Sequence, residues 1–286
     1  MTQADSNTIK QQQKQQWGRA AEGWKKQDAV IRERTEAVTR RMLDLAGIQA
    51  GRRVLDIACG TGEPAIPAAK AVGEGGFVLA TDQAPEMLEV ARGKAADEGL
   101  SNIEFRQVDG EEIDVPAESV DAVTCRWGIM FMPEPVRCLQ QANRALKPGG
   151  RIVVATWGPP EENPWISLPM GILRKYYGGP PLQDPMAPGG PFSFADQGKL
   201  GAAVEQAGFR DVSVERMELP MAVFDSAQEW WAYQLETAGP LQTIFRGLSP
   251  EDQETASREI SQAATQGRAD GRVSLMGVPL LASGTK

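Results

Sequence analysis

The residues of this 286-residue chain that could do chemistry follow short apolar runs. Residues 60–65 read GTGEPA, which fits the spacing G-x-G-x-x-A between a strand-like run and a helix-like stretch. Asp56 lies just before this loop, and Asp82 and Asp109 each come at the end of the next two apolar runs. The carboxyl ends of parallel strands meet at one edge of a sheet, where open α/β proteins bind ligands. The pattern predicts a cofactor site lined with carboxylates.

Two interpretations of the glycine loop stay open. A dinucleotide would place its pyrophosphate at the N-terminus of the following helix, where Asp56 and Glu63 would repel it. The same carboxylates favour a ligand that carries an ammonium and a sulfonium, such as S-adenosylmethionine. Asp82 can accept the ribose hydroxyls in either case. Asp109 can accept the exocyclic amine of adenine, and Met87 can flank the ring.

The absence of histidine from the sequence removes Ser-His-Asp and Cys-His catalysis, histidine metal sites and histidine general bases. The three cysteines are widely spaced and contain no CxxC pair, which argues against a disulfide framework and a zinc site. Cys59 and Cys125 are expected to be small buried residues at the sheet. We therefore expect no metal, and chemistry that depends on carboxylates, Tyr, Lys, Cys or positioning alone.

Composition and charge limit the partners. The formal net charge of −8 disfavours nucleic acid, because phosphates would be repelled. No run of about 18 apolar residues is present, so we expect no transmembrane segment. The first 16 residues are polar and rich in Gln, without a secretory signal, and are expected to be frayed. The expected location is cytoplasmic.

Short apolar runs alternate with helix-like stretches between residues 53 and 157, which is typical of a parallel sheet with helices on both faces. We expect strands at 53–58, 77–81, 103–108, 120–125 and 151–157, and helices at 63–72, 85–98 and 133–146. The KPGG sequence at 147–150 is predicted to end the last of these helices with a glycine cap.

The flanking segments carry the other expected elements. Helices are expected over 17–50, where Trp17 and Trp24 share one helix face, either packing on the sheet or forming a lid. Residues 158–195 contain many Pro and Gly and are expected to be irregular. Further expected elements are helices at 196–207, 226–238 and 250–266 and strands at 209–219 and 273–282.

Four segments in order resemble the successive motifs of class I S-adenosylmethionine-dependent methyltransferases, in particular the UbiE/Coq5-like small-molecule branch. They are VLDIACGTGEPA (54–65), ATDQAPEMLEVAR (80–92), EFRQVDGEEIDVPAESVDAVTCRWGIMFMPEP (104–135) and ALKPGGRIVVATW (145–157). The resemblance covers 53–157 tightly and 158–221 more loosely.

The resemblance implies an α/β fold with a Rossmann-like, doubly wound sheet of seven strands in the order 3-2-1-4-5-7-6, the last strand antiparallel. It divides the chain into an N-terminal helical lid (1–52) and a cofactor-binding methyltransferase domain (53–286). The insertions 158–195 and 222–270 are expected to form the substrate cover.

The expected site residues fall into three groups. Those expected to bind the cofactor are Asp56, Gly60, Thr61, Gly62, Asp82, Gln83, Met87, Asp109, Gly110, Cys125 and Arg126. Those expected to face the substrate are Trp17, Trp24, Trp127, Met130, Asn163, Trp165 and Trp231. The catalytic group is open, with Glu161, Glu162, Tyr177 and Arg126 as candidates.

The favoured hypothesis is in-line transfer of the methyl group of S-adenosylmethionine to a small, apolar or aromatic metabolite, which leaves S-adenosylhomocysteine. The sulfonium is already activated, so the protein mainly supplies proximity and alignment. The acceptor molecule and its reacting atom stay open, as does a homodimer. The alternatives are a nicotinamide-dependent oxidoreductase and a regulatory protein that binds S-adenosylmethionine without transferring it.

Overall fold

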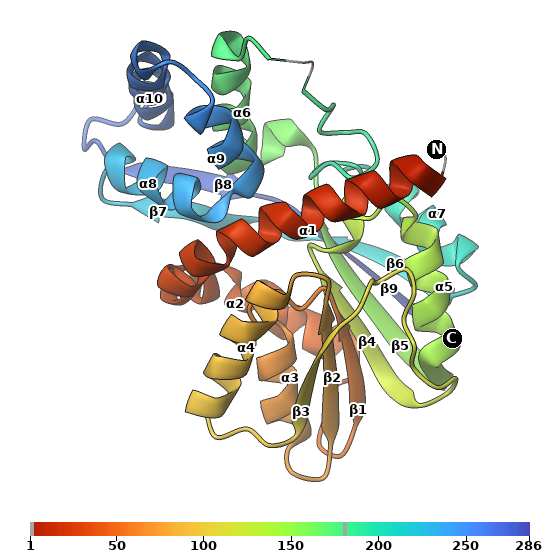
Figure 1. Cartoon of the computed structure of the whole chain (residues 1–286). Helices are drawn as coiled ribbons and strands as arrows, with labels where there is room; N and C mark the ends of the chain where they lie inside the picture. Colours follow the sequence, from red (N-terminus) through yellow and green to blue (C-terminus); the bar gives the residue numbers. More distant parts are fainter. Residues whose placement is uncertain (1–2, 180–181) are drawn as a thin grey trace.

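A seven-stranded sheet forms the centre of the computed structural model, which describes residues 3–179 and 182–286 (Figure 1). Its order is β3-β2-β1-β4-β5-β9-β6. The strands are β1 Arg53–Ile57, β2 Phe77–Asp82, β3 Ile103–Gln107, β4 Val120–Arg126, β5 Leu146–Trp157, β6 Arg210–Arg216 and β9 Pro279–Thr285. Strands β1 to β5 are parallel, and β9 runs antiparallel to both β5 and β6. The predicted sheet order and antiparallel last strand are confirmed.

The central strands are buried on both faces, as their continuous apolar runs require. Alternate residues point to opposite faces. Leu55 and Val123 lie in one core with α5 and α7, whereas Val54 and Ala122 lie in the other with α2 and α3. The covering helices are α2 Asp28–Leu45, α3 Ala65–Val72, α4 Pro85–Asp97, α5 Pro135–Ala145 and α7 Gln197–Gln206. Two rigid layers of helices therefore fix the strand ends that carry the predicted site.

The predicted glycine cap at 147–150 is wrong. Helix α5 ends at Ala145, and its C-cap, Leu146, is already extended and pairs with Val120 of β4. The next registered pair is Arg151 with Ala122, so residues 147–150 bulge out of the ladder. Gly149, with a φ of 78°, supplies the turn inside this bulge.

A second body covers the edge of the sheet that carries the site. It consists of helices α6 Pro164–Tyr176, α8 Ala227–Thr237, α9 Gly239–Arg246 and α10 Pro250–Ala264 and the antiparallel pair β7 Leu219–Phe224 and β8 Val273–Gly277. Trp230, which is fully buried, lies in its separate core. The expected irregular segment 158–195 thus contains a helix, which begins with Pro164 in its first turn.

Two expected strands divide between the sheets. The strand expected at 209–219 becomes β6, and the chain then enters the small sheet as β7. The strand expected at 273–282 begins as β8 in the small sheet and continues as β9 in the main one. Both crossings lie side by side, where Met217 N donates to the carbonyl of Pro279. These paired crossings connect the cover directly to the main sheet.

Helix α1, Gln3–Lys26, runs across the site-bearing edge of the sheet and along the cover (Figure 1). The expectation of a frayed segment over 1–16 is wrong for the described residues from 3 onward. Lys10 and Gln13 bind groups far along the chain, and these contacts support a helix that its polar composition does not suggest. Residues 1–2 lie outside the described part. No helix in the described part of the chain is long and apolar enough to span a membrane.

Candidate functional site

The loops after β1, β2, β3 and β4 converge at one edge of the sheet. The backbone N–H of Gly60 donates to Asp82 at 2.9 Å, which joins the loops after β1 and β2. A Cβ on Gly128 would lie 2.4 Å from that of Ala58, so the loops after β1 and β4 touch. A Cβ on Gly110 would lie 3.1 Å from Ile57, which brings the loop after β3 to the same place. The predicted cofactor residues therefore come together.

The glycine loop needs both of its glycines for backbone conformation. Gly60 and Gly62 have φ values of 53° and 102°, in the region that L side chains rarely adopt. A Cβ on Gly62 would also lie 2.6 Å from Ile66 of α3, whereas one on Gly60 would meet nothing within 4 Å. Gly62 therefore packs the helix, and Gly60 leaves its backbone open to close approach. Thr61 between them is buried.

Asp82 holds the loop after β2 from the end of that strand. One carboxylate oxygen accepts from Gly60 N, and the other accepts from Ala84 N at 2.8 Å. Burial raises the pKa of the Asp82 carboxyl, and the two backbone hydrogen bonds oppose that rise. Asp82 thus shapes the glycine loop, and its contact with a ribose stays a prediction. Gln83 follows it, and its carbonyl accepts from Gln107 at 3.2 Å.

Asp56 is fully buried below the glycine loop. One of its oxygens accepts from the hydroxyl of Thr124 on β4 at 2.7 Å, and Oδ2 has no hydrogen-bond partner among the described residues. Burial raises the pKa of Asp56 to about 7, against the opposing effects of the Thr124 hydrogen bond and the charge of Arg126. An unpartnered carboxylate oxygen in such a place is an acceptor for a cationic donor.

Arg126 ends β4 and joins it to α2. Its side chain is only 3% exposed, and its Nη1 donates to the hydroxyls of Thr35 and Thr39, both at 2.8 Å. Glu63 lies 4.0 Å from the same nitrogen. Burial lowers the pKa of the Arg126 guanidinium, and Glu63 and Asp56 oppose that shift. The sequence analysis missed both threonines, although their i, i+4 spacing on a buried stripe was a usable signal.

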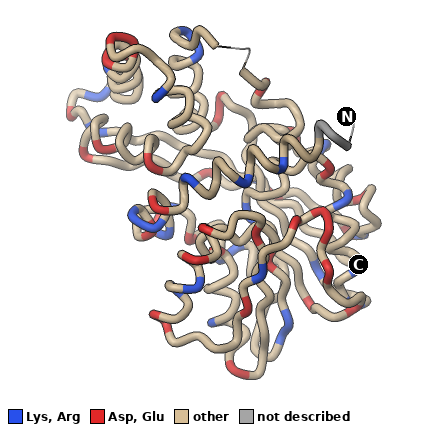
Figure 2. Tube along the Cα trace, in the orientation of Figure 1, with Lys and Arg blue, Asp and Glu red and all other residues tan. Residues whose placement is uncertain are grey.

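Asp109 meets the N-terminal helix. Lys10 of α1 donates to Asp109 at 2.7 Å and lies 2.5 Å from Glu111, which is buried. Burial, the largest single effect, lowers the pKa of Lys10. The two carboxylates together outweigh it and raise the pKa above its ordinary value. Figure 2 shows basic residues spaced along α1 and acidic residues on the segment that follows β3. Lys10 was not predicted, yet Lys10, Gln13 and Trp17 lie at i, i+3 and i+7 on one face.

Trp17 and Trp24 project from α1 as the spacing predicts. Their rings meet edge to face, with centroids 6.1 Å apart, and both pack against a core that includes Met87 of α4. Trp17 also meets Phe131, and the indole N–H of Trp24 donates to the carbonyl of Thr237 in α8 at 2.8 Å. Helix α1 is thereby fixed to both the sheet and the cover. Whether the two rings face a substrate stays a prediction.

A row of tryptophans leads from the end of β4 into the cover. Trp127 stacks on Trp157, with centroids 4.3 Å apart and planes 13° apart, and Trp157 meets Trp165 of α6 edge to face at 5.0 Å. Trp127 has a φ of 55°, a strained value for a bulky residue. The nearby Met130 and Cys125 are buried, and burial raises the pKa of the Cys125 thiol to about 12.

The remaining candidates lie farther from the cofactor loops. Asn163 donates to the carbonyls of Gly158 and Pro159 and accepts from Val278 N, so its amide holds the chain around it. Glu162 pairs with Arg216, and Glu161 is exposed. Trp231 donates to Ser257 at 3.0 Å within the core of the cover, against which Tyr177 also packs. Among the described residues, no hydrogen bond or ion pair joins these side chains to Asp56, Asp82 or Asp109.

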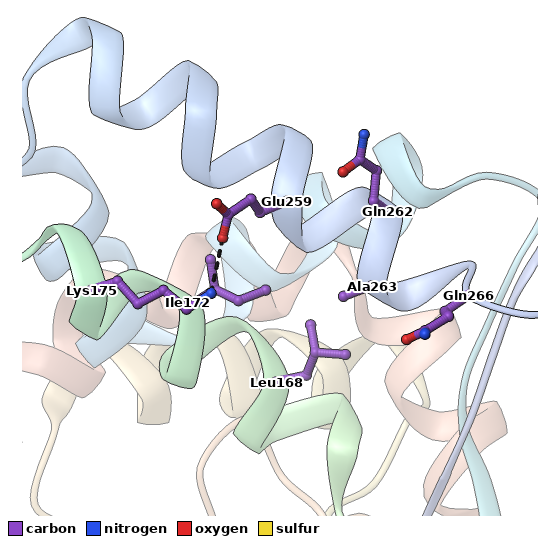
Figure 3. A pocket seen from close by; sticks show the side chains of 7 residues that line it. All are labelled: Leu168, Ile172, Lys175, Glu259, Gln262, Ala263 and Gln266. Carbon is purple, nitrogen blue, oxygen red and sulfur yellow. Dashed lines mark hydrogen bonds and ion pairs between the residues drawn. The ribbon is translucent and has the colours of Figure 1, made fainter.

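A groove lies on the cover between α6 and α10. Leu168, Ile172 and Ala263 line it, with Lys175 and Glu259 joined by an ion pair at its rim (Figure 3). None of its lining residues comes from the loops that carry the acids. In the part of the chain that the structure describes, no group of three or more Cys, Asp or Glu residues could hold a metal ion. The acid-lined strand ends therefore form the candidate site.

Comparisons with known proteins place this site in context. Residues 48–167 match the family described as "Methyltransferase domain". The chain is 38% identical over 144 residues to aklanonic acid methyltransferase DauC of Streptomyces sp. (strain C5). The aligned segment covers 47% of this chain and 64% of that protein. It is 38% identical over 122 residues to the ubiquinone/menaquinone biosynthesis C-methyltransferase UbiE of Pseudomonas putida. Here the aligned segment covers 42% of this chain and 48% of that protein.

The chain thus spans about half to two thirds of the length of these curated relatives. Among solved structures, the YcgJ protein from Bacillus subtilis superposes with a TM-score of 0.58 at 21% identity and covers 88% of this chain and 98% of its own. That likeness supports the fold alone. The matched segment 48–167 contains the glycine loop, the three predicted acids and the Arg126–Trp127 pair.

Proposed function

We propose that this chain, whose residues 48–167 match the methyltransferase-domain family and which is similar to DauC and UbiE, transfers a methyl group from S-adenosylmethionine to a small molecule. The observation that carries the proposal is the set of carboxylates at the strand ends. Asp56, Asp82 and Asp109 follow β1, β2 and β3 around one glycine loop. This arrangement matches a cationic adenosine ligand without phosphate.

The residues present fit that cofactor. The free Oδ2 of Asp56 is placed to accept from an ammonium, and a pyrophosphate there would be repelled. Asp82 would hold the ribose and Asp109 the adenine amine, next to Met87. The open space at Gly60 allows backbone to approach the ligand closely. Thr61, Gly62, Gln83, Gly110, Cys125 and Arg126 complete the proposed cofactor set.

The chain's own contribution is alignment and exclusion of water. S-adenosylmethionine, when bound, supplies a methyl group on a sulfonium that is already activated. The glycine loop and Asp82 fix the cofactor end of the attack line, and α1 with the cover closes the edge where an acceptor enters.

The three candidates for a general base differ in their surroundings. Glu161 is exposed, Glu162 is engaged by Arg216, and Tyr177 packs on the core of the cover. These placements favour an acceptor that is already nucleophilic. Trp127, Met130 and Trp165 remain the proposed substrate-facing residues nearest the cofactor loops. Trp17 and Trp24 would cover the site from α1.

The proposed acceptor is a small aromatic molecule. DauC is named for aklanonic acid and UbiE for ubiquinone and menaquinone biosynthesis. The row Trp127, Trp157 and Trp165 places apolar aromatic rings between the end of β4 and the cover. We further propose a cytoplasmic enzyme that does not bind nucleic acid, in keeping with the net charge of −8.

One experiment tests the activity and reveals the acceptor. The purified protein is incubated with S-adenosylmethionine labelled in the methyl group and a metabolite extract, and label is followed into small molecules. A thermal shift with S-adenosylmethionine but not with NAD(P) is also expected, because of the acids around the loop. A shift with NAD(P) alone would favour the oxidoreductase. Binding of S-adenosylmethionine without transfer to any extract would favour a regulatory protein.

A further inference from the structure

Two neighbouring residues at the end of β4 carry buried donors without partners. The Nε atom of Arg126 and the Nε1 atom of Trp127 are both buried and lack a hydrogen-bond partner among the described residues. The two side chains are in contact, since the Arg126 guanidinium carbon lies 4.7 Å from the centre of the Trp127 ring. Buried donors are nearly always satisfied in proteins, so a pair of free ones points to a ligand.

Contacts on one edge of the Arg126 guanidinium fix its orientation. Its Nη1 is taken up by Thr35 and Thr39 of α2, with Glu63 4.0 Å away. Nε lies on another edge of the planar group, so its N–H points away from those partners. Arginine presents donors in a rigid fork that suits a carboxylate or another oxyanion. A buried guanidinium held in this way is prepared to receive a negatively charged oxygen.

A row of tryptophan rings begins beside these donors, and the Arg126 guanidinium and Trp157 cover the faces of Trp127 itself. Trp127 stacks on Trp157, which in turn meets Trp165 of the cover. The row leads away from the glycine loop, where the acids Asp56 and Glu63 lie. An oxyanion on the cofactor side would meet these carboxylates, whereas one on the tryptophan side would meet donors and aromatic faces.

We propose that Arg126 and Trp127 form an oxyanion subsite for the methyl acceptor, which is a planar aromatic molecule bound as a phenolate, enolate or ring carboxylate. This inference rests on the proposed methyltransferase function and adds the charge and class of its substrate. Arg126 supplies the charged donor, Trp127 a neutral one, and the tryptophan row the ring contact.

The subsite also accounts for the lack of a suitable base. The chain has no histidine, and burial raises the pKa of Cys125 beside the site to about 12, so that thiol stays protonated. A phenolate or enolate bound at Arg126 already holds the electron pair that forms the new bond to the methyl carbon. The pair of the broken carbon–sulfur bond stays on sulfur. No proton has to leave in that step.

The test compares 2-naphthoate with 2-naphthamide, which share a ring and differ in charge, for binding to the full chain with saturating S-adenosylhomocysteine. The wild-type protein is expected to bind the naphthoate on the order of 10- to 100-fold more tightly, as one charge-assisted contact implies. Arg126→Gln should abolish that preference, and Trp127→Phe, which keeps the ring, should reduce it by about threefold to tenfold. Arg40→Gln, an exposed change on α2, should leave it unchanged.

Three results would overturn the subsite. The first is equal binding of the two probes by the wild-type protein, a readout that does not depend on whether a variant folds. The second is a preference that survives in a folded Arg126→Gln protein. The third is that Arg126→Gln weakens the binding of S-adenosylhomocysteine but not that of methylthioadenosine, which lacks the amino-acid end. The oxyanion at Arg126 would then be the carboxylate of the cofactor. Failure of the wild-type protein to bind S-adenosylhomocysteine would instead overturn the proposed function.

Discussion

At the scale of single residues, Asp56 is the group whose ionisation the fold shifts furthest toward neutral pH. Burial raises its pKa to about 7, far above its usual value of 3.8. The proposed cofactor brings an ammonium to the free oxygen of Asp56, and this favours the ionised form. Ligand binding and ionisation of Asp56 are therefore expected to be coupled.

This coupling predicts that S-adenosylhomocysteine binds about tenfold more tightly at pH 8 than at pH 6, since the carboxyl must lose its proton first. Asp56→Asn should flatten the pH profile to less than twofold. Calorimetric titration at several pH values measures both. Asp121→Asn, at the opposite end of β4, serves as the control because its partner is Lys147, away from the site. A wild-type affinity independent of pH would separate Asp56 from the ligand.

The raised pKa of Asp56 also affects stability. Ionisation of Asp56 favours ligand binding but lowers the free energy of unfolding. The folded protein holds the Asp56 proton between the unfolded pKa of about 3.8 and the folded pKa of about 7, whereas the unfolded chain releases it. In that window the folded state binds more protons, so the free energy of unfolding falls as pH rises and levels off above pH 7. The total effect is on the order of a few kcal/mol. Denaturant unfolding of Asp56→Asn should show a smaller fall over pH 5 to 8.

Asp82 has two tasks, and a substitution should affect both. We predict that Asp82→Ala weakens the binding of S-adenosylhomocysteine on the order of 30- to 150-fold. The loss of a charge-assisted hydrogen-bond acceptor costs about 2–3 kcal/mol, which corresponds to this change. It should also lower the free energy of unfolding by about 1–3 kcal/mol, because Gly60 N and Ala84 N lose their acceptor. Calorimetry and denaturant unfolding measure the two effects. A change in affinity below threefold would remove Asp82 from the site.

At the scale of elements, α1 determines whether the site opens. It contacts both the sheet domain and the cover, with Lys10 on Asp109 and Trp24 on Thr237. We predict that the amides of 17–30 exchange with solvent quickly in the free protein and gain protection when S-adenosylhomocysteine binds, since the lid must open to admit ligand. Hydrogen exchange by mass spectrometry measures this. The amides of α10, which packs within the core of the cover, should exchange equally in both states.

Equal protection of 17–30 with and without ligand would mean that α1 is ordinary packed structure. A sharper version uses Lys10→Met, which removes the charge from the contact with Asp109 and Glu111 but keeps much of the aliphatic chain. In the free protein this variant should exchange faster over 6–26 than the wild type. Lys14→Met, one helical turn further along α1, is the matched control.

The sequence predicted the elements whose cause is local. The strands of 53–157 follow from short apolar runs, and the helices α7 and α8 begin where Asp196 and Ser226 accept from backbone N–H groups. The acids at the strand ends follow from the same pattern, because parallel strands end at one edge. Long-range contacts were not predictable in this way. Arg126 meets Thr35 across 91 residues and Lys10 meets Asp109 across 99, and no periodicity encodes such a pair.

The predictions that were wrong share a physical cause. The Gln-rich start of the chain contains good helix formers but has no apolar stripe to predict a packed helix, and contacts of Lys10 and Gln13 with distant loops support the helix instead. In the segment 158–195, Pro164 begins a helix instead of breaking one, and Pro169 is tolerated within it. At 147–150 the glycines serve a bulge in β5 because strand pairing with β4 resumes immediately. In each case the packing or pairing partners lie far along the chain, and the local pattern did not encode them.

At the scale of the whole molecule, α1 is the member that joins the sheet to the cover across the site. Ala20 and Ala21 pack on the core that contains Met87 of α4, while Trp24 reaches Thr237 of α8. Gly23 allows this close approach, since a Cβ there would lie 1.9 Å from the carbonyl oxygen of Glu236. That neighbour is backbone and cannot rotate away. Helix α1 and the cover can therefore meet only because position 23 lacks a side chain.

We predict that Gly23→Ala separates α1 from α8, lowers the free energy of unfolding by about 1–3 kcal/mol through overpacking, and weakens S-adenosylhomocysteine by opening the lid. Gly93→Ala is the matched control, because a Cβ at that helical position in α4 meets nothing within 4 Å. It should be neutral or stabilise by up to about 1 kcal/mol through higher helix propensity. Denaturant unfolding followed by tryptophan fluorescence, with calorimetry of ligand binding, compares the two. If both variants matched the wild type in stability and affinity, the contact at Gly23 would not hold the two bodies together. Closure of the site would then have to depend on Lys10 and on the chain crossings at Met217 and Val278.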